Sequence, residues 1–338
     1  MNSFIFGIDV GGQSVKSGLF SLQGRLLQKE IIETDTTNNG DSVLLDTAHM
    51  LLCQIKEVGL SMKDCYGIGI CVPGPVVKNT IVNHCVNIGW SVKNVAKELA
   101  AHLAALTSSD SSPETSFPRI IVSNDANAAL LGEATAGAGK GTSFKGKPST
   151  AVMLTLGTGV GGSILLKNNL IEGTTGSAGE VGHMPITVVD PYLYPQGKTA
   201  SLESFIGAKA MERHSKALLS GETLTPKEIF DLAGNPLAGS YNTKKPGNKN
   251  DAAGYIANFT GKILGQALAS IASVLDSDLF IIGGGVAGAG QALLQPARDS
   301  YKTYAFHSMK DISIVPARLG NDAGIIGCYY SCVSSSAS

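Results

Sequence analysis

A glycine-rich turn near the start of the chain carries residues suited to phosphate chemistry. The segment FGIDVGGQSVKSGLF (residues 6–20) runs from an apolar strand through Asp9 into Gly11 and Gly12, and then directly into a second strand. A dinucleotide-binding motif or P-loop must lead into a helix, so this turn is a β-hairpin instead. Its backbone N–H groups can line an anion-binding concavity, and we expect Asp9 to hold Mg²⁺ through water. A single turn of this kind is more often an ordinary glycine-rich hairpin.

The same layout recurs in the second half of the chain. The segment VMLTLGTGVGGSILLKNNLIEG (residues 152–173) again has an apolar strand, a Gly-Gly turn, a second strand and a polar turn into a third. Helix-like stretches then alternate with short strands, which predicts a βββαβα unit occurring twice, with a cleft between the copies. Two equivalent hairpins in opposite halves favour phosphate binding, because together they would clamp a polyphosphate from both sides.

Asp125 has the position expected of a reacting group. The segment SNDAN (residues 123–127) places Asp125 at the carboxyl end of a predicted strand, where ligands of α/β folds bind. Phosphoryl transfer to a hydroxyl needs a base that takes the hydroxyl proton. An Asn or Asp before AALLGEA would also cap a helix, but two adjacent polar residues exceed what a cap needs. Glu180 and His183 lie three apart, on one face if that segment is helical, although alone such a pair is more often structural.

The composition excludes several other classes of protein. A chain of 338 residues exceeds one ordinary core, which predicts two domains of roughly 150 residues. No apolar run approaches the ~20 residues of a membrane span and the first residues do not resemble a signal peptide, so we expect a cytoplasmic protein with no membrane partner. A net charge of −1 without a basic block argues against nucleic acid as a partner. Six cysteines without C-x-x-C spacing are expected to be reduced and partly buried.

Taken in order, the motifs resemble the ROK sugar kinases, within the actin/hexokinase-like ATPase fold. The residues that carry this resemblance are GIDVGGQSVKSGLF (7–20), VPGPV (72–76), NIGW (87–90), VSNDANAALLGEA (122–134), LGTGVGGSILL (156–166), GTTGSAGEVGHMPI (173–186), LES (202–204), IIGGGVA (281–287) and ARLGNDAGIIGC (317–328). The resemblance implies an α/β protein with a duplicated actin-like ATPase (ribonuclease H-like) fold and two domains with a central cleft. We expect an N-terminal domain of residues 1–123, on which a C-terminal helix (317–338) packs back, and a second domain of residues 124–316.

The resemblance also implies an activity: ATP-dependent phosphorylation of a hexose hydroxyl, glucokinase-like, giving a sugar 6-phosphate with ATP and Mg²⁺. In the family pattern Asp125 is the general base, and the sugar hydroxyls are bound by Asn124, Glu180, His183 and Glu203, with Gly74 and Asn87 as further candidates. The residues expected at ATP are Asp9, Gly11, Gly12, Gln13, Ser14, Lys16, Gly157, Thr158, Gly159, Gly161, Gly284 and Gly285. The segment GNDAG (320–324) is expected to begin a helix, and the chain to form a homodimer.

The chain departs from the family pattern in one region. Most members carry a cysteine-rich knuckle after the histidine, where three thiolates and that histidine bind a structural zinc. Here the interval is MPITVVDPYLYPQGKTAS, without cysteine, so we expect no structural zinc. Pro191 and Pro195 are expected to restrict this loop, and Tyr192 and Tyr194 to pack on the domain. A smaller difference is Gln13, at a position where the family usually has Thr.

Three alternatives stay open at this level. Within the kinases, the acceptor could be an N-acetylhexosamine (ManNAc or GlcNAc), allose or fructose. From a different class, the chain could be a sugar-sensing regulator with a silent site, although such a protein need keep only the sugar pocket and not Asp9, Asp125 and both hairpins. An acetate-kinase-like or chaperone-type ATPase would leave Glu180, His183 and Glu203 without a role.

Overall fold

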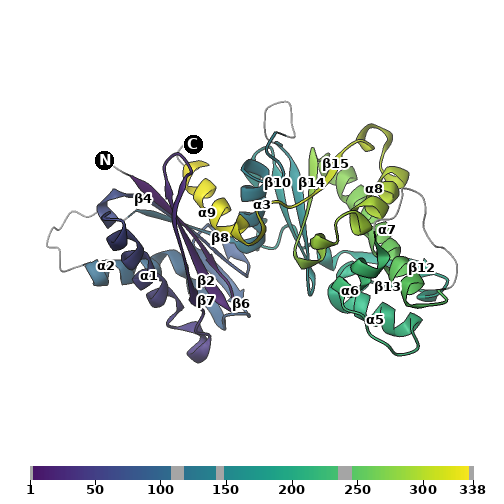
Figure 1. Cartoon of the computed structure of the whole chain (residues 1–338). Helices are drawn as coiled ribbons and strands as arrows, with labels where there is room; N and C mark the ends of the chain where they lie inside the picture. The colour runs from purple at the N-terminus through teal and green to yellow at the C-terminus, as the bar shows by residue number, and fades with distance from the viewer. Residues whose placement is uncertain (1–2, 108–117, 142–147, 235–245, 335–338) are drawn as a thin grey trace. The chain divides into compact units, whose positions relative to one another are not determined.

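The chain folds into two α/β units. The computed structural model describes residues 3–107, 118–141, 148–234 and 246–334 (Figure 1). Its internal contacts divide the chain into a first unit (1–137, 172–178 and 321–338) and a second unit (138–171 and 179–320). Each unit contains one five-stranded mixed sheet.

The first sheet has the strand order β3-β2-β1-β4-β8. Its strands are β1 (Phe4–Val10), β2 (Ser14–Ser21), β3 (Leu26–Glu33), β4 (Cys65–Val72) and β8 (Arg119–Asn124). The first three pair antiparallel, whereas β4 and β8 run parallel to β1. Strands β1 and β4 are apolar along their length because helices cover both faces of a central parallel pair. A small sheet of β5 (Val76–Val77), β6 (Ile81–Cys85) and β7 (Trp90–Asn94) follows β4.

Alternate residues of β1 contact different helices. Phe4, Phe6 and Ile8 join the core formed with α1 (Val43–Glu57) and α2 (Val95–Thr107). Ile5 instead packs with residues of α9 (Ala323–Ser334) on the opposite face. On that face α9 approaches the sheet backbone closely: a Cβ on Gly7 would lie 2.0 Å from the carbonyl oxygen of Ile325. Only glycine permits this spacing, so the C-terminal helix lies directly on the strand that carries Asp9.

The second sheet repeats the first. Its order is β11-β10-β9-β14-β15, built from β9 (Ala151–Leu156), β10 (Val160–Leu166), β11 (Asn169–Leu170), β14 (Leu279–Gly283) and β15 (Ser313–Pro316). Again the first three strands pair antiparallel and the last two run parallel to the first. The same order and the same strand directions in both units confirm the predicted duplication.

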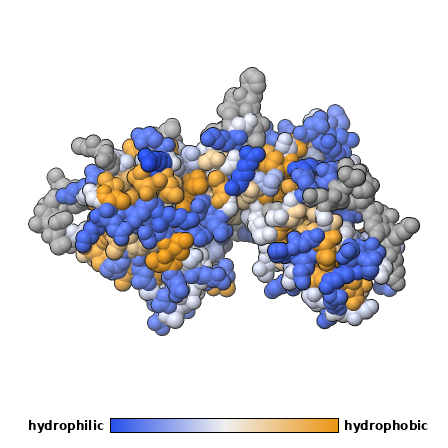
Figure 2. All heavy atoms as spheres, in the orientation of Figure 1, coloured by the Kyte–Doolittle hydropathy of each residue, from blue (hydrophilic) through white to orange (hydrophobic). Residues whose placement is uncertain are grey.

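The remaining elements of the second unit surround this sheet. Its core joins residues of β9 and β14 with α7 (Lys249–Leu275) and α8 (Gln291–Tyr304). The hairpin of β12 (Pro185–Asp190) and β13 (Tyr194–Ser201) and the helices α4 (Glu203–Ile206), α5 (Ala208–Leu218) and α6 (Pro226–Ala233) complete the unit. On the face in view, hydrophilic side chains are interspersed with apolar patches (Figure 2). Within the described ranges, no helix has both the length and the apolar character needed to cross a membrane.

The division between the units differs from the predicted boundary at residue 123. Helix α3 (Asp125–Thr135), which we expected to open the second domain, belongs to the first unit. The reason is its contact with α9: a Cβ on Gly327 would lie 1.7 Å from the carbonyl oxygen of Ala128, so the two helix backbones nearly touch. Helix α9 itself also belongs to the first unit.

Candidate active site

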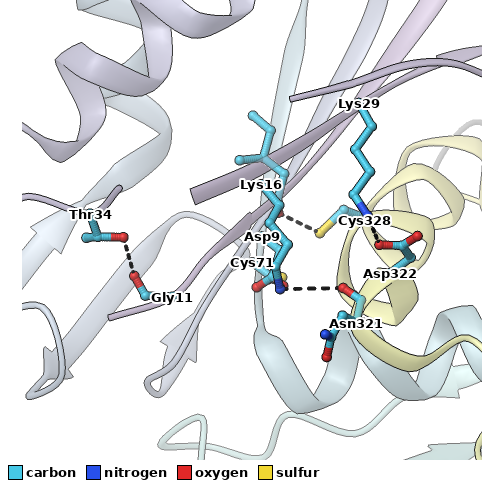
Figure 3. A network of polar contacts seen from close by, with 10 residues as sticks. Asp9, Gly11, Lys16, Lys29, Thr34, Cys71, Asn321, Asp322 and Cys328 are labelled. Carbon is cyan, nitrogen blue, oxygen red and sulfur yellow. Dashed lines mark hydrogen bonds and ion pairs between the residues drawn. The ribbon is translucent and has the colours of Figure 1, made fainter. Parts of the chain in front are cut away.

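The carboxylate of Asp9 is held by neighbours on both adjacent strands (Figure 3). In the sheet register Asp9 lies opposite Lys16 on β2 and opposite Cys71 on β4. The ammonium of Lys16 donates to Oδ2 of Asp9 at 3.3 Å, and the thiol of Cys71 donates to Oδ1 at 3.5 Å. Lys16 also reaches the carbonyl oxygen of Asn321 at 3.5 Å. The register therefore brings a carboxylate and a cation together at the end of β1, beside the glycine turn.

Cys71 is a contact of this site that the sequence analysis did not single out. The thiol of Cys71 is buried, and its pKa is raised well above the ordinary value. The largest cause is its hydrogen bond with Cys328, and the next is burial. Cys71 therefore stays a neutral donor to Asp9. The signal that could have found it is the pairing of two apolar runs, FIFGIDV and CYGIGICV, whose ends lie side by side when the strands are aligned. All six cysteines lie in the described ranges and none is in a disulfide; four of them are buried, as predicted.

The turn after β1 is tight and internally bonded. The N–H of Gly11 donates to the carbonyl oxygen of Ser14 at 2.9 Å. The carbonyl oxygen of Gly11 accepts from the hydroxyl of Thr34 at 2.7 Å. A Cβ on Gly12 would lie 3.0 Å from the carbonyl oxygen of Asn87. The structure thus brings Asn87, a predicted sugar residue, beside the predicted phosphate turn.

Asn124 and Asp125 lie where β8 ends and α3 begins. Asn124 is the helix cap: its Oδ1 accepts from the N–H of Ala126 at 2.9 Å and from that of Asn127 at 3.2 Å. Its amide nitrogen donates to the carbonyl oxygen of Gly74 at 3.2 Å, which joins two predicted sugar residues. The side chain of Asp125 accepts from the N–H of Ala126 at 2.8 Å. The cap is therefore supplied by Asn124, and the carboxyl of Asp125 is available for another role.

The environment of Asp125 favours its protonated form more than water does. Burial raises the pKa of Asp125 to about 6, the negative charge of Asp9 acts in the same direction, and the hydrogen bond from the Ala126 N–H opposes them. A carboxyl with this pKa is ionised at neutral pH and holds a proton more firmly than an ordinary Asp. These are the properties of a general base that works near neutral pH.

The second hairpin differs in detail from the predicted one. Its turn consists of Gly157, Thr158 and Gly159, closed by a hydrogen bond of 2.9 Å from the N–H of Gly157 to the carbonyl oxygen of Gly159. The pair Gly161–Gly162, which resembled the turn in the sequence, lies inside β10. Beside the turn is Gly284, with φ of +84°, where a Cβ would lie 2.4 Å from the carbonyl oxygen of Leu156. The predicted nucleotide glycines of the second unit are thus neighbours.

Val160 links this turn to the predicted sugar residues. Its N–H donates to Oε2 of Glu203 at 3.0 Å. A Cβ on Gly182 would lie 1.9 Å from the carbonyl oxygen of Val160, so the two backbones are in close contact. Gly182 belongs to the one-turn 3₁₀-helix Val181–His183, which lies between Glu180 and β12. Both Glu180 and His183 are exposed. The structure therefore gathers Glu180, His183 and Glu203 around the start of β10, a long-range contact that no local pattern showed.

The hairpin β12–β13 occupies the interval that lacks the cysteine-rich knuckle. As predicted, both tyrosines pack on the unit: the ring of Tyr192 lies 5.4 Å from that of Tyr255, and the ring of Tyr194 lies 5.2 Å from that of Phe205. The hydroxyl of Tyr194 is also 2.8 Å from Nε2 of His214. Among the described residues there is no cluster of three or more His, Cys, Asp or Glu side chains suited to a metal ion. The segment GNDAG forms a short turn (Gly320–Asp322) leading into α9, also as predicted.

The duplicated units define an actin-like ATPase fold, and comparison with known proteins places the chain within it. The model of the ROK family matches residues 5–332, so the chain belongs to the ROK family. A glucokinase from Halalkalibacterium halodurans is 33% identical over 339 residues, covering 95% of this chain and 92% of the relative. The ROK hexokinase from Thermus thermophilus superimposes with a TM-score of 0.71 at 26% identity, covering 98% of this chain and 99% of that one. A ROK glucokinase from Streptomyces griseus, in complex with glucose and AMPPNP, gives a TM-score of 0.64 at 25% identity over 98% of this chain and 100% of that one.

Proposed function

We propose that the chain is an ATP-dependent hexose kinase that transfers the γ-phosphoryl group of ATP to the 6-hydroxyl of glucose or a close relative. The observation that carries the proposal is Asp125, a carboxyl at the end of β8 whose pKa is raised to about 6 and whose neighbour Asn124 supplies the helix cap. Membership of the ROK family and the glucokinase relative support the same activity.

In this proposal Asp125 takes the proton of the acceptor hydroxyl as its oxygen bonds to the γ-phosphorus, and ADP leaves with the bridging oxygen. The sugar is oriented by hydrogen bonds to Asn124, Glu180, His183 and Glu203, with Gly74 and Asn87 beside them. The N–H of Val160 fixes Oε2 of Glu203, while Oε1 has no partner among the described residues and can accept from a hydroxyl. Several carboxylates and an amide around one ring suit a polyol.

The phosphates of ATP would lie along the two glycine turns, Gly11–Ser14 and Gly157–Gly159, with Gly161, Gly284 and Gly285 nearby. The close approach of backbone at Gly12 and Gly284 leaves no room for side chains, as a phosphate cradle requires. The carboxylate of Asp9 is a hard oxygen donor that fits Mg²⁺ bound through water, and Lys16 adds a positive charge. The ion would neutralise charge on the transferred phosphoryl group.

The proposal is tested by coupled ADP release with a panel of glucose, mannose, fructose, allose, N-acetylglucosamine and N-acetylmannosamine, each with ATP and Mg²⁺. We expect the highest kcat/KM for glucose and ADP release that depends on sugar. Turnover restricted to another sugar of the panel would keep the kinase and change the acceptor. Sugar binding by calorimetry without turnover of any sugar would contradict the proposal and favour a sensing protein.

A further inference from the structure

A cavity lies in the second unit, between the hairpin β12–β13 and one face of α7. Its volume is about 290 Å³, close to the lower limit for small-molecule sites. Polar side chains in its lining are Asp190 from the hairpin and Tyr255, Asn258, Lys262 and Gln266 from α7, while Phe259 is among the apolar ones. None of these residues belongs to the proposed kinase site. Their spacing along α7 places them on one helix face.

Asn258 is the strongest sign that the cavity takes a ligand. This side chain is only 5% exposed, yet its Oδ1 has no hydrogen-bond partner among the described residues. A buried acceptor without a donor is unfavourable, and a ligand hydroxyl or N–H group that reaches it would satisfy it.

The carboxylate of Asp190 is fixed at the opposite wall. Its Oδ1 accepts from the N–H groups of Tyr192 at 3.0 Å and Leu193 at 2.8 Å, and its Oδ2 accepts from the hydroxyl of Tyr255 at 2.7 Å. Burial raises the pKa of Tyr255, so this hydroxyl stays protonated and remains a donor. Since each carboxylate oxygen can accept more than one hydrogen bond, Asp190 offers a further, rigidly placed acceptor.

Lys262 supplies the opposite charge. Its side chain is exposed and, within the part of the chain that the structure describes, forms no ion pair. It lines this cavity and also an adjoining one on the α8 side, shared with Gln266. These features match a sugar that carries an anionic group. The ammonium of Lys262 suits the anion, the two acceptors suit hydroxyls, and the ring of Phe259 suits the apolar face of the sugar.

We propose that this cavity binds a sugar phosphate, with hydroxyls at Asn258 and Asp190 and the phosphate at Lys262. The site is separate from the kinase site, and its ligand class follows from its own side chains. That the ligand resembles the product of the enzyme rests on the proposed function. The hairpin connects the two sites: His183 lies just before β12 and Glu203 just after β13, with Pro185 paired to Ser201 between them. An occupant that fixes the hairpin at Asp190 is therefore expected to change the apparent KM for sugar.

Binding is measured by calorimetry on the full chain without nucleotide, with glucose 6-phosphate, glucose and inorganic phosphate as separate probes. We expect Lys262→Met to weaken binding of glucose 6-phosphate by at least about fivefold, the effect of losing one charge-assisted contact at the surface. The matched control, Lys310→Met, removes another exposed lysine of the same unit and is expected to leave binding unchanged. Asn258→Leu is expected to weaken binding without lowering stability, because it removes the unpaired acceptor.

Several outcomes would overturn the proposal. Binding of glucose 6-phosphate that Lys262→Met leaves unchanged would place the ligand elsewhere, including the kinase site. Inorganic phosphate binding as tightly as glucose 6-phosphate would reduce the cavity to an anion site. Loss of glucose binding in Lys262→Met equal to the loss of glucose 6-phosphate binding would show that Lys262 does not act on the phosphate. The measurement needs no turnover, so its failure and the failure of the proposed kinase activity are distinguishable.

Discussion

Asp125 takes its chemistry from two residues beside it in the sequence and from one on a distant strand. Asn124 caps α3, the N–H of Ala126 bonds the Asp125 carboxyl, and Asp9 on β1 raises its affinity for a proton. The register of β1 against β2 and β4 in turn places Lys16 and Cys71 on Asp9. A mutation at any of these positions is therefore expected to alter the protonation of Asp125 as well as local contacts.

The first prediction concerns that protonation. With selectively labelled aspartate carboxyl carbons, NMR titration of the substrate-free protein is expected to show one carboxyl with a pKa of about 6, absent from Asp125→Asn. Asp9→Asn is expected to lower this pKa, because it removes a negative charge that raises it. Titration of Asp125 near 4, or no response to Asp9→Asn, would contradict the environment described for the base.

At the scale of elements, the two hairpins are expected to bind the phosphates of ATP. In Gly12→Val the new Cβ would lie 3.0 Å from the carbonyl oxygen of Asn87. In Gly159→Val it would lie 2.3 Å from the carboxylate of Glu203. We predict a rise in the apparent KM for ATP for both variants.

The two variants are informative as a pair. Gly12→Val is expected to raise the KM for ATP far more than that for sugar. Gly159→Val is expected to show the same order, with an added effect on sugar because Glu203 lies against the turn. Steady-state kinetics with each substrate varied in turn would measure both. A larger effect on sugar than on ATP in both variants would mean that the sub-sites are exchanged.

The hairpin β12–β13 carries the next prediction, that the kinase works without structural zinc. The packing of Tyr192 and Tyr194 and the hydrogen bond between Tyr194 and His214 hold the hairpin in place, which is the role that zinc has in the family pattern. Burial lowers the pKa of His214 to about 4, so the imidazole is neutral at physiological pH and suits an aromatic cluster. Elemental analysis of purified protein is expected to find no stoichiometric zinc, and a zinc-selective chelator with Mg²⁺ in excess is expected to leave activity intact. One zinc per chain, or inactivation reversed only by zinc, would contradict this account.

Local patterns in the sequence predicted the elements well and their long-range contacts poorly. The repeated strands and the polar turns depend on neighbouring residues, and the structure has them. The turn of the second hairpin was misplaced because Gly161 and Gly162 look like a turn although they lie in β10. The contacts of Cys71 with Asp9 and of Glu203 with Val160 join segments far apart in sequence, so no local signal reported them.

For the whole molecule, the same reasoning explains the boundary between the units. The sequence analysis placed the end of the first domain at residue 123. Close contact of α3 with α9, through Gly327 and Ala128, instead assigns α3 to the first unit. This contact joins residues separated by most of the chain.

A prediction at this scale follows from the chain positions of the proposed ligands. Asn124 and Asp125 belong to the first unit, whereas Glu180, His183 and Glu203 belong to the second. One sugar bound to all of them would draw the units together and exclude water. Small-angle scattering is expected to show a smaller radius of gyration with sugar than without it, and ATP hydrolysis is expected to need sugar. An unchanged radius together with sugar-independent hydrolysis would contradict this prediction.

The most direct test of the central claim is single-residue replacement of the base. Asp125→Asn keeps the shape of the side chain and the hydrogen bond from Ala126 but cannot take a proton. The variant is expected to stay folded: a raised pKa means that the charge of Asp125 opposes folding above pH 6, so removing it is not destabilising at neutral pH. We predict that kcat for hexose phosphorylation falls by about 10²–10⁴, while calorimetry shows sugar binding largely unchanged. A fall in kcat of less than about tenfold, with the fold intact, would show that Asp125 is not the base.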